Sequence, residues 1–180
     1  MAFFDKEFKE IFSSEVISVL GGLLVGVFLA IYTDKLLLIP GMLILLPGFL
    51  EMRGNISGSL ASRISSGLFL KVISPKDYKS KIVSGNVIAA TLLAIMVSLF
   101  LGLLAFTFDY LVLHKVVIEI IFIPLIAGII ANAIEIVVTL AATFYLFKKG
   151  HDPNNIMGPF VTTTGDVTST LALLFAILII

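Results

Sequence analysis

The sequence contains no cysteine among its 180 residues. Disulfides, iron–sulfur clusters and zinc sites built on thiolates are therefore excluded. Charged residues are scarce as well: they make up 13% of the chain, whereas soluble domains carry roughly 25%. Hydrophobic residues make up 59% of the chain, and the mean hydropathy is +1.15. This composition predicts an integral membrane protein whose main surroundings are the lipid bilayer.

An excess of charge of one sign is also missing, because twelve basic and twelve acidic residues cancel. Nothing in this balance favours a nucleic-acid partner. The start of the chain lacks the basic region of a cleavable signal peptide, since it carries Asp5, Glu7, Glu10 and Glu15. Residues 1–15 are instead expected to form a cytoplasmic or interfacial helical arm with apolar residues at helical spacing. Those apolar residues are Phe4, Phe8, Ile11 and Phe12.

Five long apolar segments follow, and a helix needs roughly 20 residues to cross the hydrocarbon core. They lie at 16–32, 36–70, 82–108, 116–147 and 153–180. The second is too long for one straight span and holds Pro40, Pro47 and Gly48, so we expect it to be tilted, kinked or broken. The last should begin with Asp152 as its cap and Pro153 at its first position. The pattern predicts an all-α polytopic membrane protein with five transmembrane helices, forming one domain over residues 1–180.

Basic residues in the connections indicate how such a bundle is oriented. With five spans, the N-terminal arm and the second-to-third and fourth-to-fifth connections share one side. That side holds Lys6, Lys9, Lys71, Lys76, Lys79, Lys81, Lys148 and Lys149. The other side holds Lys35 and Lys115. The positive-inside rule then predicts a multi-pass protein of the cell membrane, with its N-terminus in the cytoplasm and its C-terminus outside.

Polar residues in the second span fall on one helix face, because they are spaced three or four apart. They are Glu51, Asn55, Ser59, Ser62 and Ser66. A close helix–helix seam explains the serines together with Gly54 and Gly58. A seam explains Glu51 and Asn55 less easily, since a charge at membrane depth costs roughly 2.5–3.5 kcal/mol unless it faces protein or water.

The last span repeats this feature with Thr162, Asp166 and Thr170, spaced by four. Pro159 cannot donate a hydrogen bond to the carbonyl of Asn155, which is thereby freed. Carboxylate and carbonyl oxygens are the ligands that hard divalent cations prefer. Irregular backbone at membrane depth is tolerated where it lines a cavity. The segment therefore favours an ion site or a pore.

Other roles for the intramembrane charges stay open. The alternative role for Asp166 is a structural ion pair with Arg53 or Arg63. In the fourth span, Glu135 shares one face with Asn132, Thr139 and Thr143. Glu135 is as well suited to neutralising an arginine as to binding an ion. Three acidic residues against two arginines leave a net charge of minus one within the spans, which favours a cation pathway.

Two segments resemble the transmembrane domain of the MgtE magnesium transporters and their eukaryotic solute-carrier relatives. The stretch 51–65, Glu-Met-Arg-Gly-Asn-Ile-Ser-Gly-Ser-Leu-Ala-Ser-Arg-Ile-Ser, is similar to the eukaryotic pattern Lys-Gly-Asn…Leu-Ala-Ser-Arg-Leu-Ser. Asp152-Pro153, the stretch 158–163 (Gly-Pro-Phe-Val-Thr-Thr) and the stretch 166–168 (Asp-Val-Thr) resemble the fifth helix of bacterial MgtE.

The resemblance implies a dimer with a pore along its two-fold axis, lined by the second and fifth helices of both subunits. Asp166 would hold a hydrated Mg²⁺, with Asn55 and the carbonyl of Thr162 orienting the water shell. Glu51 and Glu135 are further candidate ligands. Mg²⁺ is expected as the transported ion, with no resident cofactor. A half-size domain without the cytosolic gating domains of bacterial MgtE implies a homodimer, or a heterodimer with a sister half.

Other functions remain as alternatives. Within transport, an exchanger coupled to Na⁺ or H⁺ stands beside a passive channel. A non-transporting scaffold or accessory subunit would instead keep its polar residues paired in a dry interior. An enzyme is not expected. The stretch 163–166, Thr-Thr-Gly-Asp, lacks the first glycine of the membrane aspartyl protease motif, and both His114 and His151 lie in connections.

Overall fold

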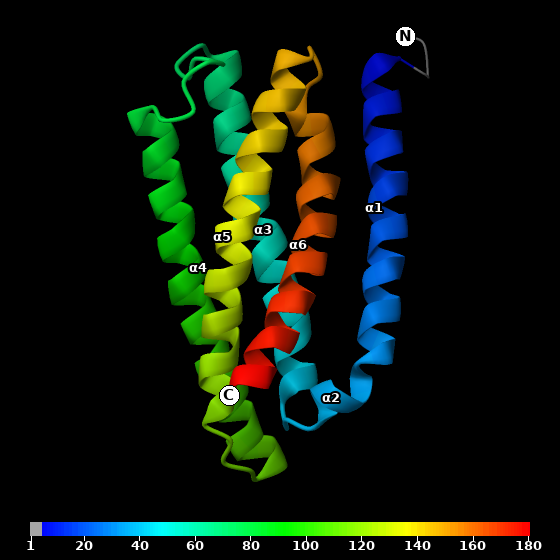
Figure 1. Ribbon diagram of the computed structural model, residues 1–180, viewed down its shortest axis with the longest axis vertical. Helices are drawn as coiled ribbons and strands as arrows, with labels where there is room; N and C mark the ends of the chain where they lie inside the picture. Colours follow the sequence, from blue (N-terminus) through cyan, green and yellow to red (C-terminus); the bar gives the residue numbers. More distant parts are fainter. Residues whose placement is uncertain (1–4) are drawn as a thin grey trace.

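The computed structural model describes residues 5–180, which fold into six α-helices and one π-helix (Figure 1). The elements are α1 Lys6–Ile31, α2 Thr33–Leu37, α3 Met42–Phe69, α4 Lys81–Phe108, η1 Asp109–Leu113, α5 Glu119–Lys148 and α6 Pro153–Ile179. The five long helices run along the long axis of the molecule (Figure 1). Helix α6 packs against α1, α3 and α5, and α4 covers α3 and α5 from the other side. The all-helical class predicted from the sequence is confirmed.

Four stretches are long and apolar enough to cross a membrane, judged over residues 5–180 by length and composition. They are Lys6–Ile31, Lys81–Leu113, Glu119–Lys148 and Pro153–Ile179. Helix α3 is of similar length, with 28 residues, but it carries Glu51, Arg53 and Arg63 and is not among the four. The apolar pattern is therefore borne out for four of the five predicted spans.

Residues 6–15 of the predicted arm and residues 16–31 of the predicted first span belong to one continuous helix from Lys6 to Ile31. Asp5 caps this helix, since its carboxylate accepts a hydrogen bond from the backbone N–H of Phe8 at 2.9 Å. The helix begins well before residue 16 because its acidic first turns favour a helix start. Phe4, the first residue of the predicted apolar stripe, lies outside the described residues.

The irregularity predicted in the second segment lies before α3. Helix α2 ends at Leu37, the chain turns through residues 38–41, and α3 begins at Met42. Gly41 has a φ of 76°, which glycine adopts without strain, and the carboxylate of Asp109 occupies the space where a Cβ would be. Pro47 lies inside α3 without ending it. The predicted break is thus a turn at the end of the bundle.

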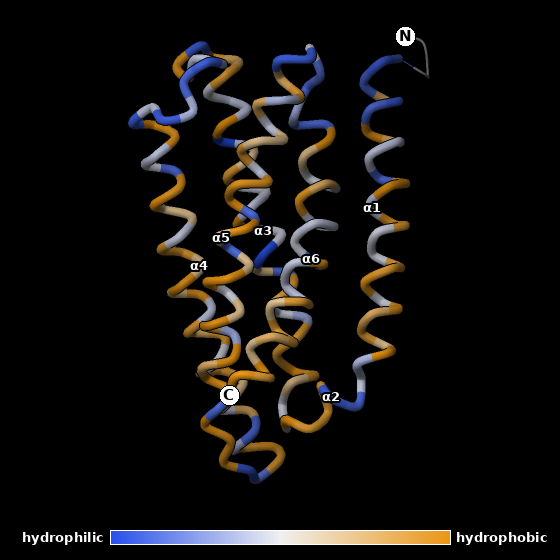
Figure 2. Tube along the Cα trace, in the orientation of Figure 1, coloured by the Kyte–Doolittle hydropathy of each residue, from blue (hydrophilic) through white to orange (hydrophobic). Residues whose placement is uncertain are grey.

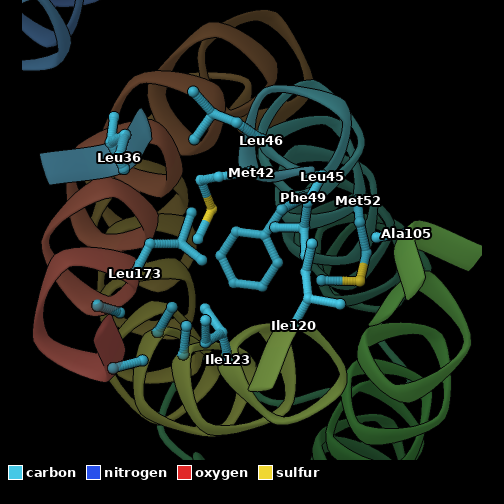
Figure 3. Close-up of a cluster of buried hydrophobic side chains, with 14 residues drawn as sticks. Leu36, Met42, Leu45, Leu46, Phe49, Met52, Ala105, Ile120, Ile123 and Leu173 are labelled. Atoms are coloured by element: carbon cyan, nitrogen blue, oxygen red, sulfur yellow. The ribbon is translucent and has the colours of Figure 1, made fainter. Parts of the chain in front are cut away.

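Buried apolar side chains gather at two levels of the bundle. The Phe49 cluster joins α3 to α5 and α6, with the ring of Phe49 pointing into its middle (Figure 3). Its buried members are Leu36, Met42, Leu45, Leu46, Phe49, Met52, Ala105, Ile120, Ile123, Ala127, Ala131, Ala172, Leu173 and Ala176. The Ile64 cluster lies nearer the other end and consists of Leu60, Ile64, Leu68, Ile73, Val83, Ala90 and Phe144. Lipid tails are as apolar as these side chains, so close packing is what stabilises both clusters.

The connections divide between the two ends of the bundle (Figure 1). The start of α1, the α3–α4 connection and the α5–α6 connection share one end, and the α1–α3 and α4–α5 connections share the other. Hydrophilic residues mark both ends, while the helices between them are mostly apolar (Figure 2). The eight lysines that the sequence assigns to one side therefore gather at one end of the bundle, which we call the lysine-rich end.

Gly102 of α4 provides a test of the contact between α4 and α5. A Cβ at this position would lie 2.6 Å from the backbone oxygen of Ile121 and 2.9 Å from its Cα. Gly102→Ala should therefore push the two helices apart and cost about 1–3 kcal/mol, as overpacking does. Gly85→Ala on the same helix is the control, because no atom lies within 4 Å of its added Cβ. The melting temperature (Tm) of the purified protein should fall for Gly102→Ala only; equal values would contradict this contact.

Candidate cation site and the buried polar layer

A pocket of about 480 Å³ lies between α3 and α6, near the middle of both helices. Its lining residues are Pro47, Leu50, Glu51, Gly54, Asn55, Gly58, Ser59, Gly158, Val161, Thr162 and Asp166. The set includes two carboxylates, one amide and two hydroxyls, and none of these residues is basic. The pocket is therefore acidic and rich in oxygen atoms.

The sequence positions the pocket through the spacing of small and polar residues on α3. A Cβ at Gly54 would lie 4.0 Å from the Cα of Thr162, and one at Gly58 would lie 3.9 Å from the side chain of Val161. These glycines therefore let α6 come close, as the predicted seam requires. The polar stripe on the adjoining face of α3, which begins at Glu51, is left exposed beside the seam. The seam and the polar pocket are thus both present.

Some polar groups of the pocket already form hydrogen bonds within the protein, and others do not. The amide of Asn55 donates a hydrogen bond to Glu51 Oε1 at 3.1 Å. The hydroxyl of Thr162 donates to the carbonyl of Gly158 at 3.0 Å. Asp166 is half-buried and forms no hydrogen bond or ion pair with residues 5–180, although the charge of Glu51 acts on it. Asp166 is thus the unpaired carboxylate of the pocket.

The carbonyl that Pro159 frees is used for helix packing. The hydroxyl of Ser14 on α1 donates a hydrogen bond to the carbonyl oxygen of Asn155 at 3.2 Å. Asn155 does not line the pocket between α3 and α6. The sequence correctly indicates a carbonyl without its usual helical hydrogen bond at this position. Its partner is a hydroxyl of the neighbouring helix α1.

Glu135 lies outside the pocket and is fully buried. The hydroxyls of Thr164 and Thr168 on α6 donate to its carboxylate oxygens at 3.3 and 3.1 Å. Arg53 of α3 is also fully buried, and its Nη1 donates to Asn132 Oδ1 of α5 at 3.3 Å. The charges of Arg53 and Glu135 act on each other without a direct ion pair. Of the two roles open to Glu135, this arrangement favours neutralising an arginine.

The two buried charges belong to a polar layer between the Phe49 cluster and the Ile64 cluster. Its buried members are Arg53, Ser57, Asn132, Glu135, Thr139, Thr143, Ser169 and Thr170. Figure 2 shows the hydrophilic part of α3 half-way along its length. Asn132 also donates from Nδ2 to Thr91 Oγ1 at 3.4 Å, which connects α4 to this layer. The layer therefore joins four helices at mid-height.

Glu51 and Arg53 are placed on different sides of α3 because residues two apart in a helix project about 200° from each other. Glu51 reaches the pocket, whereas Arg53 points into the bundle. The alternative of an ion pair between Asp166 and either Arg53 or Arg63 is not realised. Sequence reasoning considered Arg53 as a partner of Asp166 and missed its link to Asn132, although this helical spacing was the available signal.

No three His, Asp or Glu side chains within residues 5–180 lie close enough together to form a metal site by themselves. Mg²⁺ does not require such a cage, because it keeps most of its waters and is held by one or two carboxylates. The pocket has the groups that a hydrated divalent cation needs.

Comparison with known proteins agrees with this chemistry. A sequence model of the MgtE family, described as divalent cation transporters, matches residues 46–176. This range extends from α3 to α6 and includes both walls of the pocket. A search of curated proteins gave no match to the chain.

The coupling between Arg53 and Glu135 can be tested by removing one charge. Glu135→Gln should leave the buried Arg53 without a counter-charge and destabilise the fold by about 3–5 kcal/mol, as breaking a buried charge pair does. The double variant Arg53→Met, Glu135→Gln should recover much of that loss. Glu51→Gln, on the exposed face, is the control. Thermal unfolding in detergent without Mg²⁺ measures all three; equal Tm values for Glu135→Gln and Glu51→Gln would contradict the coupling.

Proposed function

The chain belongs to the MgtE family of divalent cation transporters, and on that premise we propose that it moves Mg²⁺ across a membrane through the pocket between α3 and α6. The observation that carries this proposal is the unpaired carboxylate of Asp166, which lines the pocket together with Glu51 and Asn55. Mg²⁺ is the transported ion in this proposal, and no resident cofactor is involved.

The size of the pocket supports a hydrated ion. Six waters at about 30 Å³ each occupy about 180 Å³, less than half of the pocket's volume of about 480 Å³. Mg²⁺ gives up water reluctantly, so a roomy site suits it better than a tight one. Asp166 binds the ion through its water shell, and Asn55 and the carbonyl of Thr162 orient that shell. Glu51 adds a second carboxylate, and the buried Glu135 acts on the site through the effect of its charge on Asp166.

Helix α3 is the fifth membrane span in this proposal. Its 28 residues extend about 42 Å at 1.5 Å per residue, which exceeds the roughly 30 Å of the hydrocarbon core. It packs against α4, α5 and α6. Of its charged residues at mid-height, Arg53 is buried. Glu51 lines the pocket on the exposed face of α3.

A second copy of the chain completes the pathway. The polar stripe of α3, together with Arg63, is exposed in a single chain. Lipid contact along this stripe would be costly, whereas an identical stripe across a two-fold axis would cover it. Two copies of Asp166 would then face one channel. The same surface would also accept a sister half in a heterodimer, and the homodimer is the simpler arrangement.

The lysine-rich end of the bundle faces the cytoplasm in this proposal, because cytoplasmic connections carry the excess of Lys and Arg. The protein is then a multi-pass protein of the cell membrane, with its C-terminus outside the cell. A potential that is negative inside favours entry of a cation by about 2.3 kcal/mol per charge per 100 mV, or about 4.6 kcal/mol for Mg²⁺. Passive entry therefore needs no coupled ion, although the exchanger alternative uses the same pocket.

The scaffold alternative is less well supported. A scaffold would hold its intramembrane charges in paired, sealed positions. Arg53 and Glu135 are sealed in the bundle and hydrogen-bonded to Asn132 and to two threonines. Asp166 instead has no partner among residues 5–180 and faces an open pocket. An unpaired, half-buried carboxylate at this depth serves transport better than packing.

Uptake of Mg²⁺ into proteoliposomes tests the role of Asp166. Asp166→Asn keeps the shape of the side chain but removes the charge that holds the ion, so uptake should fall at least tenfold. Asp34→Asn is the matched control, because Asp34 is exposed in α2 and far from the pocket lining. Equal uptake by both variants and the original protein would contradict the proposed site and move attention to Glu51 or Glu135.

Cysteine cross-linking tests the proposed dimer axis, and the chain has no cysteine of its own to interfere. Ser59→Cys places a thiol on the exposed stripe of α3, where two copies would approach to within disulfide distance. Val137→Cys, which is 65% exposed on α5, is the control. Oxidation in membranes should give a covalent dimer for Ser59→Cys only. Absence of dimer for Ser59→Cys, Ser62→Cys and Ser66→Cys alike would rule out this interface.

A further inference from the structure

Helix α1 is attached to the rest of the bundle through α6 and the short α2. Ser14 and Val25 are its buried residues, and Figure 1 shows it standing apart from the other long helices. Helix α1 also lies outside the range that the family model matches. The groove between α1 and α6 is therefore a surface to which the proposed transport assigns no role.

A pocket of about 580 Å³ lies in this groove at the lysine-rich end. Its lining residues are Lys6, Lys9, Glu10, Ser13, Ser14, Ile17, His151 and Ile156. The single acidic residue in it, Glu10, is already engaged by His151 at 2.8 Å, by Asn155 at 3.3 Å and by Lys6 at 3.7 Å. The ammonium group of Lys9 has no partner among residues 5–180. Lys6 also donates to the carbonyl oxygen of Gly150 at 2.7 Å, but an ammonium group has three protons to donate. The pocket can therefore offer Lys9, and one remaining proton of Lys6, to an anion.

A second pocket of about 220 Å³ lies in the same groove, deeper in the apolar part of the bundle. Its lining residues are Leu24, Val25, Phe28, Val167, Thr170 and Leu171. Apart from the buried Thr170, every one of these residues is apolar. A cavity of this kind suits a hydrocarbon chain.

Helical spacing places both pockets on the same flank of the groove. On α1 the lining residues Lys6, Ser13, Ile17, Leu24 and Phe28 are separated by seven, four, seven and four. On α6 the lining residues Ile156, Val167 and Leu171 are separated by eleven and four. Intervals of four, seven and eleven residues return to nearly the same helix face. The two pockets are separate, because Thr163 of α6 packs on Gly21 of α1 and donates a hydrogen bond to Ser18 between them. An elongated molecule that occupies both pockets would pass over this contact on the outer face of the groove.

The distance between the two pockets matches one leaflet of a bilayer. Eleven residues separate Ser13 from Leu24, which is about 16 Å along the helix at 1.5 Å per residue. Half of the hydrocarbon core is about 15 Å. A molecule with its anionic group beside Lys9 and Ser13 would therefore reach Leu24 and Phe28 with one acyl chain.

We propose that the α1–α6 groove binds an anionic phospholipid from the leaflet at the lysine-rich end, with its phosphate on Lys6, Lys9 and Ser13 and one acyl chain in the Leu24–Phe28 pocket. Basic pockets between transmembrane helices are where acidic head groups bind. The bound lipid holds α1 against α6, the helix that carries Asp166. This proposal does not depend on the proposed ion pathway.

Thermal unfolding of the full chain in detergent, with added phosphatidylglycerol, tests the proposal. Phosphatidylglycerol should raise the Tm. Phosphatidylcholine, whose head group has no net negative charge, and inorganic phosphate, which has no acyl chain, should raise it much less. The double variant Lys6→Gln, Lys9→Gln should need at least tenfold more phosphatidylglycerol for the same rise. Lys76→Gln, Lys79→Gln is the matched control, with the same charge change at the same end but in the α3–α4 connection.

Val167→Trp supplies a second, independent variant, because a tryptophan at this 40% exposed position would fill the apolar pocket without entering the core. It should abolish the rise in Tm caused by phosphatidylglycerol while leaving the lipid-free Tm near that of the original protein. Three results would each overturn the proposal: equal protection by phosphatidylcholine or by inorganic phosphate, equal loss in both lysine double variants, or undiminished protection of Val167→Trp.

Discussion

The structure depends on two opposite charges buried at the middle of a bundle that lies in lipid. Arg53 and Glu135 are both inaccessible, and a bilayer offers neither charge the water that it would need outside the protein. The helices must therefore supply partners themselves. Arg53 of α3 is bonded by Asn132 of α5, and Glu135 of α5 is bonded by threonines of α6. The relative rotation of these three helices follows from that requirement.

The position of the pocket is a consequence of this rotation. Once Arg53 faces α5, the side of α3 that carries Glu51 and Asn55 turns away from the bundle interior and toward the exposed edge of α6. Gly165 of α6 packs against Arg53, with the place of its missing Cβ 3.9 Å from the Cβ of Arg53, and Asp166 beside it is thereby directed into the pocket. The buried layer joins the helices, and in the proposed function the exposed polar residues beside it bind the ion.

Much of this arrangement is predictable from local patterns. Apolar runs indicate the long helices, Asp152 and Pro153 mark the start of α6 where the structure has it, and four-residue spacing places Glu51 and Asn55 on one face. Local patterns do not show that residues 6–15 of the predicted arm continue without interruption into the rest of α1. Local patterns also do not identify the hydrogen-bond partner of the Asn155 carbonyl. Ser14 lies 141 residues away in sequence, and only the packing of α1 on α6 brings the two residues together.

Three properties follow from composition and from the 3.6-residue period: the chain is helical, it belongs in a membrane, and a handful of polar residues share helix faces. These properties do not reveal that Glu135 is buried and bonded by threonines of α6, whereas Asp166 has no partner among residues 5–180. Glu135 and Asp166 look alike as carboxylates in apolar spans. Their environments differ because of which neighbouring helix each one faces, and that is set by contacts between segments far apart in the chain.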